Sequence, residues 1–212
     1  MSIEDEQGVD SGWGPDGTES LLPYVAFVGV ALTLGSTLLS TTLSPSFAWQ
    51  SNALSNLGVT SSDAGTTTTV VVFNGGLILG GLVGAAFNAA SYRRLSVRRD
   101  RILAALAGTA LGLMALIGVF PQNTAMHFPV AISYFLLISV TLWVDGAARI
   151  RAGKTLPGGL ALAGGTVNLL AWVLWFGLLE DPFEGIAIPE IIGSVIFGVW
   201  LCSFAVRIAG DL

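Results

Sequence analysis

The chain has 212 residues, of which 53% are hydrophobic and only 11% are charged, too few charges to cover the surface of a soluble domain. The same composition excludes a disordered chain, and the single cysteine, Cys202, excludes a secreted disulfide scaffold. Fourteen acidic residues against nine basic residues exclude the basic surface of a nucleic-acid-binding protein. We therefore predict an integral membrane protein whose main partner is the lipid bilayer, with no nucleic-acid partner.

Residues 1–20 contain six acidic residues, four glycines and no basic residue. We expect them to form a disordered acidic cytoplasmic tail and not a signal peptide, because a signal peptide needs a basic start. The basic residues of the whole chain are eight arginines and one lysine, Lys154. An acidic surface with little lysine suits a high-salt cell interior, so we also hypothesise a halophilic source.

Six apolar stretches follow, and each has about the 20 residues that a helix needs to cross a hydrocarbon core of roughly 30 Å. Each is apolar on all faces, which is typical of a membrane span and not of a surface helix in a soluble bundle. The stretches are Leu21–Leu43, Thr67–Ala90, Ile102–Phe120, His127–Val144, Pro157–Leu179 and Ile186–Val206. We therefore predict an all-α fold, a polytopic membrane bundle of six transmembrane helices over residues 21–207, with a short cytoplasmic tail at 208–212.

The first long connection, residues 44–66, mixes polar side chains with apolar anchors. The anchors are Phe47, Trp49, Leu54 and Leu57. This spacing predicts a short helix that ends at Gly58 and either lies in the membrane interface or folds back over the bundle. A connection of this length in a compact bundle is often functional.

Small residues predict where the spans pack closely. Gly80 and Gly84 in the second span, like Gly108 and Gly112 in the third, are four residues apart and share a helix face. Glycines at this spacing let two backbones approach each other, so we expect helix contacts at these four positions.

A few polar residues fall within or beside the spans and gather near one membrane face. Ser55 and Asn56 lie in the long connection, Asn74 in the second span, His127 at the start of the fourth and Glu190 in the last. A carboxyl group inside a span costs roughly 2.5–3.5 kcal/mol on insertion scales, so Glu190 should face a cavity or a partner. We predict a polar pocket with Asn56, Asn74, His127 and Glu190 as candidate ligand-binding residues. Ser55, His127 and Glu190 are the candidate catalytic residues.

Each candidate also has a structural interpretation. Asn74 could form a hydrogen bond between helices, His127 could be a hydrogen-bonded core residue, and Glu190 could lie in the interface, where its cost is small. A single histidine cannot supply both axial ligands of a bis-His haem, and the sequence has no Cys or His cluster for zinc. We therefore expect no cofactor and no metal.

The basic residues predict the orientation in the membrane. All nine fall in the connections after the second and fourth spans or at the end of the sixth, and the three alternate connections have none. The positive-inside rule then places both termini in the cytoplasm of a multi-pass protein in the plasma membrane. The polar pocket would face outward.

The order of short motifs along the chain resembles a known family. The motifs are Ser55–Gly58 (SNLG), Phe73–Gly76 (FNGG), Gly118–Pro121 (GVFP), His127 and Glu190. They resemble the domain of unknown function family 998, integral membrane proteins of bacteria and archaea with about six helices, over residues 21–207. The family usually has Asp where this chain has Asn56, and a basic residue where it has Ile191. The resemblance implies the fold but no particular activity.

Three classes of function remain open. The first is a non-enzymatic membrane protein that binds a lipid or another ligand or joins a complex as a subunit. The second is an intramembrane enzyme acting on an outer-leaflet lipid, with Ser55 as nucleophile, His127 as base and Glu190 orienting the imidazole. The third is a small-solute or proton-coupled transporter, which needs ionisable groups along a path at mid-membrane. The absence of a recognisable catalytic motif favours the first class, and an enzyme remains possible.

Overall fold

The computed structural model describes residues 21–177 and 185–209, so the acidic tail expected over residues 1–20 lies outside the described residues. The described chain contains six α-helices, one short 3-10 helix and no strand. The helices are α2 (Leu22–Leu43), η1 (Leu54–Gly58), α3 (Thr67–Arg94), α4 (Arg98–Val119), α5 (His127–Arg151), α6 (Thr155–Gly177) and α7 (Ala187–Ala209). All six α-helices are long and apolar enough to cross a membrane, which confirms the predicted all-α membrane bundle.

Three helices continue past the carboxyl ends of the apolar stretches from which they were predicted. The helix predicted over Thr67–Ala90 continues to Arg94, the one predicted over His127–Val144 continues to Arg151, and α7 runs into the expected tail as far as Ala209. Hydropathy marks where a span leaves hydrocarbon, whereas backbone hydrogen bonding continues into the charged residues. Basic side chains in the last turn stabilise this continuation because the carboxyl end of a helix carries partial negative charge.

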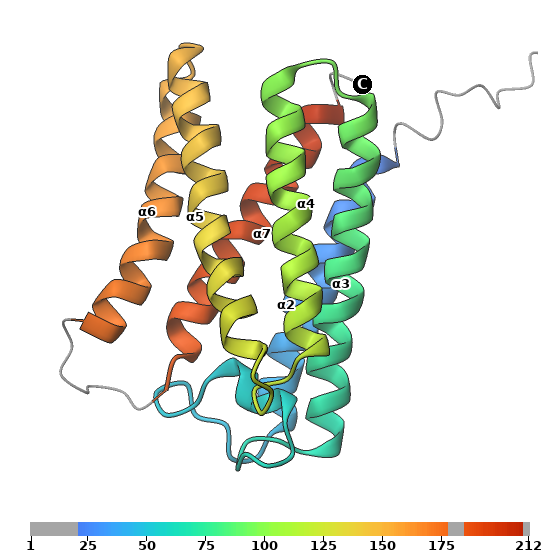
Figure 1. Cartoon of the computed structure of the whole chain (residues 1–212), viewed down its shortest axis with the longest axis vertical. Coiled ribbons are helices and arrows are strands. Elements are labelled where there is room, and N and C mark those ends of the chain that lie inside the picture. The colour runs from blue at the N-terminus through green and yellow to red at the C-terminus, as the bar shows by residue number, and fades with distance from the viewer. Residues whose placement is uncertain (1–20, 178–184, 210–212) are drawn as a thin grey trace, which may run out of the picture.

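The helices form two groups, which meet where α4 packs on α5 and where α7 packs on both groups. α2 packs on α3 and α3 on α4, while α5 packs mainly on α6, and α7 contacts both α2 and α6 (Figure 1). The side chains of Phe87, Leu103, Ile138, Leu201 and Phe204 are almost fully buried and form the centre of the core.

The glycines of α3 pack closely, but those of α4 do so only in part. A Cβ atom at Gly80 would lie 2.7 Å from the Gly29 carbonyl oxygen of α2, so only glycine allows this approach. At Gly108 the nearest atom would be 3.2 Å away, and at Gly112 none would lie within 4 Å. The contact expected at Gly112 is therefore absent, because that face of α4 has open space beside it.

The bundle has two chemically distinct ends. We call the end that carries η1, the α4–α5 connection and the start of α7 the η1 end, and the opposite end the arginine end (Figure 1). The chain's nine basic residues all belong to the arginine end, at the end of α3 and the start of α4, around the α5–α6 turn and in the last turn of α7.

Candidate functional site

The connection between α2 and α3 folds back onto the bundle at the η1 end. Leu54 and Leu57 of η1 are buried, and Leu57 has no exposed surface. Phe47 and Trp49 pack against the same core and against each other, with ring centroids 5.3 Å apart. Burial of these apolar side chains holds the loop down and brings Ser55, which is 4% exposed, inside the protein.

Two asparagines fix η1 in place. Asn56 accepts a hydrogen bond from the Ala53 N–H at Oδ1 (2.7 Å) and donates one from Nδ2 to Gln122 Oε1 (2.6 Å). Asn74 of α3 donates from Nδ2 to the Gly58 carbonyl oxygen at 2.9 Å. Within the described chain, neither asparagine lines the cavity at this end, so their amides position the loop.

The segment that leads into α7 pairs with the same loop. The Gly185 N–H donates to the Gln50 carbonyl oxygen and the Ala187 N–H to the Asn52 carbonyl oxygen, each at 3.0 Å. A side chain at Gly185 would collide with the Asn52 backbone. The Trp175 indole N–H of α6 donates to the Gly185 carbonyl oxygen at 2.6 Å. These bonds set the position of the first turn of α7.

Glu190 lies in that first turn and is 8% exposed. Its Oε2 atom accepts a hydrogen bond from the Leu54 N–H at 2.5 Å, although the two residues are 136 positions apart. Within the described chain no hydrogen bond is found for Oε1. Pro189 is tolerated beside Glu190 because N–H groups in the first turn have no partner within the helix. The carboxyl group therefore fastens η1 to α7 and leaves one oxygen available.

His127 begins α5 and closes the connection from α4. Because the residue before a proline is disfavoured in a helix, Pro121 ends α4 at Val119 and leaves the Phe120 carbonyl outside it. The His127 Nδ1 atom lies 2.8 Å from that carbonyl oxygen. A carbonyl can only accept, so Nδ1 carries the hydrogen and donates it. In the neutral ring Nε2 is then the nitrogen that can accept a hydrogen bond from a ligand.

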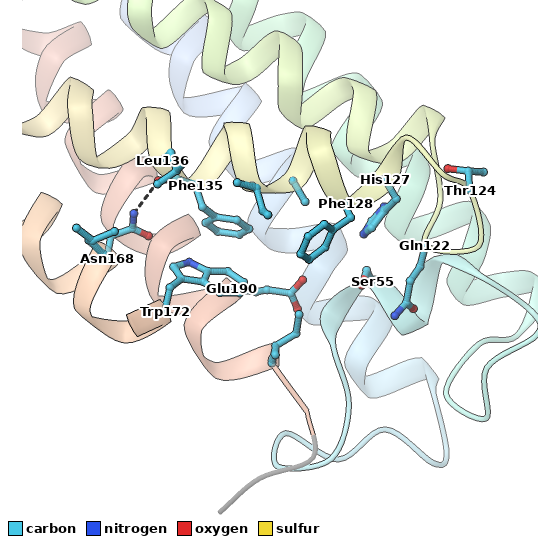
Figure 2. Close-up of a pocket in the computed structure, with 14 residues that line it drawn as sticks. Ser55, Gln122, Thr124, His127, Phe128, Phe135, Leu136, Asn168, Trp172 and Glu190 are labelled. Carbon is cyan, nitrogen blue, oxygen red and sulfur yellow. Dashed lines mark hydrogen bonds between the residues drawn. The ribbon is translucent and has the colours of Figure 1, made fainter. Parts of the chain in front are cut away.

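Ser55, His127 and Glu190 line one cavity of 340 Å³ between α5, α6, α7 and η1 (Figure 2). Gln122 and Thr124 lie beside them and make this part of the wall polar. The rest of the wall is mostly apolar. Its apolar residues are Phe128, Ala131, Ile132, Phe135, Leu136, Leu169, Trp172 and Ile186.

The cavity wall on α5 continues onto the outer surface of the helix bundle. Phe128 is 65% exposed, Ile132 43% and Leu136 50%, and these residues are spaced four apart on one face. In a chain that crosses a membrane, such a face lies against hydrocarbon. The apolar part of the cavity wall therefore borders the surface that faces hydrocarbon.

Asn168 of α6 lies at the far end of the cavity from Ser55 (Figure 2). Its Nδ2 atom donates to the Phe135 carbonyl oxygen and to Ser139 Oγ, both at 2.8 Å. Its Oδ1 atom is buried and has no hydrogen-bond partner within the described chain. A Cβ atom at Gly193 would collide with this oxygen, so Oδ1 lies close to the backbone of α7 and only glycine leaves room for it there.

The interior narrows from this cavity toward the arginine end. A second cavity of 40 Å³ shares Glu190 with the first, and a third of 20 Å³ shares Tyr134 with the second. Beyond them, the rings of Phe197, Trp200 and Phe204 stack along α7, with successive centroids 5.8 and 5.2 Å apart. In this conformation of the described chain, the large cavity therefore does not continue through the bundle to the arginine end.

A buried charge cluster closes the arginine end. Arg207 of α7 lies 2.6 Å from Asp100 of α4 and 3.4 Å from Asp145 of α5, and both carboxylates are almost completely buried. Asp145 also accepts hydrogen bonds from Arg149 and from the Trp200 indole N–H, each at 2.8 Å. The sequence predictions missed both aspartates, although carboxylates among so many arginines were a signal of pairing.

The structure brings together three of the five predicted site residues. Ser55, His127 and Glu190 share the cavity, whereas Asn56 and Asn74 hold η1. The carboxyl group of Glu190 binds η1, and the imidazole is oriented by the Phe120 carbonyl instead. The wall residues Gln122, Thr124 and Trp172 were missed by sequence reasoning, as was the position of Asn168 in the wall. The PQNT sequence just before His127 was the available signal for the first two.

Metal binding by the described residues has little support. The cavity holds one histidine and one carboxylate, and no group of three or more His, Cys, Asp or Glu side chains gathers anywhere in the described chain. Two ligands are fewer than the three or four protein ligands of zinc sites.

Comparison with known proteins identifies the family but adds no activity. Neither a curated protein nor a solved structure matches the chain significantly. One family model, described as a protein of unknown function (DUF998), matches residues 27–207. This match covers α3 to α6 and η1 completely, most of α2 and α7, and the residues that line the cavity described above. The chain therefore belongs to the DUF998 family.

Proposed function

We propose that this protein binds an amphipathic molecule carried by the membrane, which enters the 340 Å³ cavity sideways from the hydrocarbon between α5 and its neighbours. The observation that carries the proposal is the two-part wall: polar at Ser55, His127 and Glu190, and apolar along the exposed face of α5. A purely water-soluble ligand would gain nothing from the apolar part.

The cavity volume limits how such a molecule can bind. A water-sized chemical group occupies about 30 Å³, so a cavity of 340 Å³ has room for roughly eleven such groups. A lipid with long acyl chains therefore cannot enter completely. Its headgroup and the first part of one chain would occupy the cavity, and the rest of the chain would stay in the bilayer beside Phe128, Ile132 and Leu136.

The basic residues support an orientation for this site. All nine lie at the arginine end, so the positive-inside rule favours that end, with both termini, in the cytoplasm. In a plasma membrane the cavity would then serve the outer leaflet. A dead-end cavity closed by stacked rings supports binding over transport.

Native mass spectrometry on protein extracted gently from its own membrane tests the proposal. Ala131 lines the cavity, and Ala131→Phe adds a ring that fills it. Ala163 on the exposed face of α6 lies outside the cavity, so Ala163→Phe is the matched control. We expect the wild type and Ala163→Phe to retain a bound lipid and Ala131→Phe to lose it.

Two results would contradict the proposal. One is equal lipid retention in all three proteins. The other is retention of a stoichiometric protein partner and no lipid, which would identify a subunit of a membrane complex instead.

A second candidate function is an intramembrane lipid-modifying enzyme. The observation that favours it is the presence of Ser55 and His127 in one cavity, with the imidazole held by the Phe120 carbonyl. Within the described chain, however, no hydrogen bond joins the Ser55 hydroxyl to His127, as an activated serine requires. Covalent labelling of Ser55 by a lipid-like fluorophosphonate, lost in His127→Gln, would support the enzyme.

A further inference from the structure

We infer that the cavity selects an uncharged or cationic headgroup that donates a hydrogen bond, a hydroxyl or an amine, and rejects anionic headgroups. This inference rests on the proposed function, because it names the chemistry of the molecule that enters the same cavity. Its basis is the set of hydrogen-bond donors, hydrogen-bond acceptors and charged groups in the cavity wall that are not already used in bonds within the protein.

The acceptors that remain lie at both ends of the cavity. At the η1 end, Glu190 keeps Oε1 after Oε2 has bound the Leu54 N–H, and His127 keeps Nε2 after Nδ1 has bound a carbonyl. At the far end, the buried Oδ1 atom of Asn168 has no hydrogen-bond partner in the described chain. A buried acceptor without a partner is costly, so a ligand that donates to it is favoured.

Part of the donor capacity of the wall is already used. The Thr124 hydroxyl already donates to the Pro121 carbonyl oxygen at 2.8 Å. Gln122 has its oxygen occupied by Asn56, which leaves its amide N–H groups. The Ser55 hydroxyl can donate as well as accept. A ligand hydroxyl group can also both donate and accept a hydrogen bond, so it matches the donors and acceptors of the wall.

The charge of the wall opposes an anion. No lysine or arginine lines the cavity, because all nine basic residues belong to the arginine end. Among the described residues, the carboxyl group of Glu190 is the one acidic group in the lining. A phosphate, sulfate or carboxylate headgroup would therefore be desolvated in a wall that has no lysine or arginine to compensate its charge. An ammonium headgroup would donate its N–H groups to the acceptors of the wall.

Four probes with the same chain separate these effects: oleyl alcohol, oleylamine, oleyl methyl ether and oleyl sulfate. Each is added to purified protein in a neutral detergent, and retention is measured by native mass spectrometry. We expect the alcohol and the amine to bind at least about tenfold more tightly than the ether, which cannot donate, and than the sulfate, which is anionic.

The outcomes distinguish this inference from the proposed function. Equal binding of all four probes, or tighter binding of the sulfate, would overturn the headgroup preference and leave lipid binding intact. Binding of none of them, in wild type and in Ala131→Phe alike, would overturn the proposed function itself.

A conservative variant tests the source of the selectivity. Glu190→Gln keeps an oxygen for the Leu54 N–H but removes the ionisable carboxyl group, so the variant is expected to fold. We expect the preference for oleylamine over oleyl sulfate to fall severalfold in Glu190→Gln and to be unchanged in Ala163→Phe. An unchanged preference in Glu190→Gln would show that this carboxyl group does not select the headgroup.

Discussion

The carboxyl group of Glu190 and the backbone N–H of Leu54 form a 2.5 Å hydrogen bond that joins the last helix to the loop after the first. This bond sets the shape of the cavity, because η1 supplies Ser55 and α7 supplies Glu190 itself. Glu190 could be taken for a catalytic acid because it is a carboxyl group within a membrane span. One of its oxygens has a structural partner, the Leu54 N–H, and the other oxygen faces the cavity.

This double role predicts a difference between two substitutions of Glu190. Glu190→Leu removes the acceptor and leaves the Leu54 N–H buried without a partner, which costs about 1–3 kcal/mol. Glu190→Gln keeps an acceptor and should cost less. Thermal unfolding in detergent, combined with protease cleavage in residues 44–66, measures both effects. Equal midpoints for the two variants would show that the bond does not hold the loop.

The charge cluster at the arginine end predicts a large loss of stability. Arg207→Met leaves Asp100 and Asp145 buried with fewer partners, and breaking a buried pair in this way costs roughly 3–5 kcal/mol. Arg151→Met is the control, because Arg151 is exposed. We expect a lower thermal midpoint for Arg207→Met alone. If Arg207→Met and Arg151→Met behaved alike, the cluster would contribute little to folding.

The glycines predict a contrast between two chemically identical changes. Gly80→Ala places a methyl group 2.7 Å from the Gly29 carbonyl oxygen, so α2 and α3 must move apart. Gly112→Ala enters open space and gains helix propensity. We expect thermal unfolding to show a destabilised Gly80→Ala and a neutral or stabilised Gly112→Ala. A stable Gly80→Ala would contradict the close approach of α2 and α3.

The proposed orientation predicts which end a membrane-impermeant reagent can reach. Ser61, in the loop after η1, and Arg151, at the other end, are both exposed, and the single native cysteine can be replaced by Cys202→Ser. In this background we expect an impermeant maleimide to label Ser61→Cys but not Arg151→Cys in intact cells. Labelling of both should follow when the membrane is opened. Selective labelling of Arg151→Cys would reverse the orientation.

Much of the fold could be predicted from hydropathy, because a span must be apolar along its whole length. The start of α5 at His127 and the first turn of α3 at Thr67 were predicted to the residue. The continuation of α5 to Arg151 was not, because charged residues outside hydrocarbon form helix without any apolar signal.

The candidate site was harder to predict, because its geometry depends on contacts between distant residues. Polarity identified Glu190, but nothing in the sequence connects it to the Leu54 N–H. Asn74 and Asn168 are both amides within spans, yet one holds a loop and the other faces the cavity. That difference arises from helix rotation, which composition alone does not determine when every face is apolar.

Photo-crosslinking tests most directly whether a lipid chain occupies the cavity from the side. The probe is an oleyl alcohol with a diazirine near its hydroxyl end, added to the wild type, Ala131→Phe and Ala163→Phe, with the modified peptides mapped by mass spectrometry. The account predicts crosslinks concentrated in residues 127–136 and 168–172, lost in Ala131→Phe and kept in Ala163→Phe. Crosslinks spread evenly over the exposed faces of all six helices, and unchanged by Ala131→Phe, would contradict it.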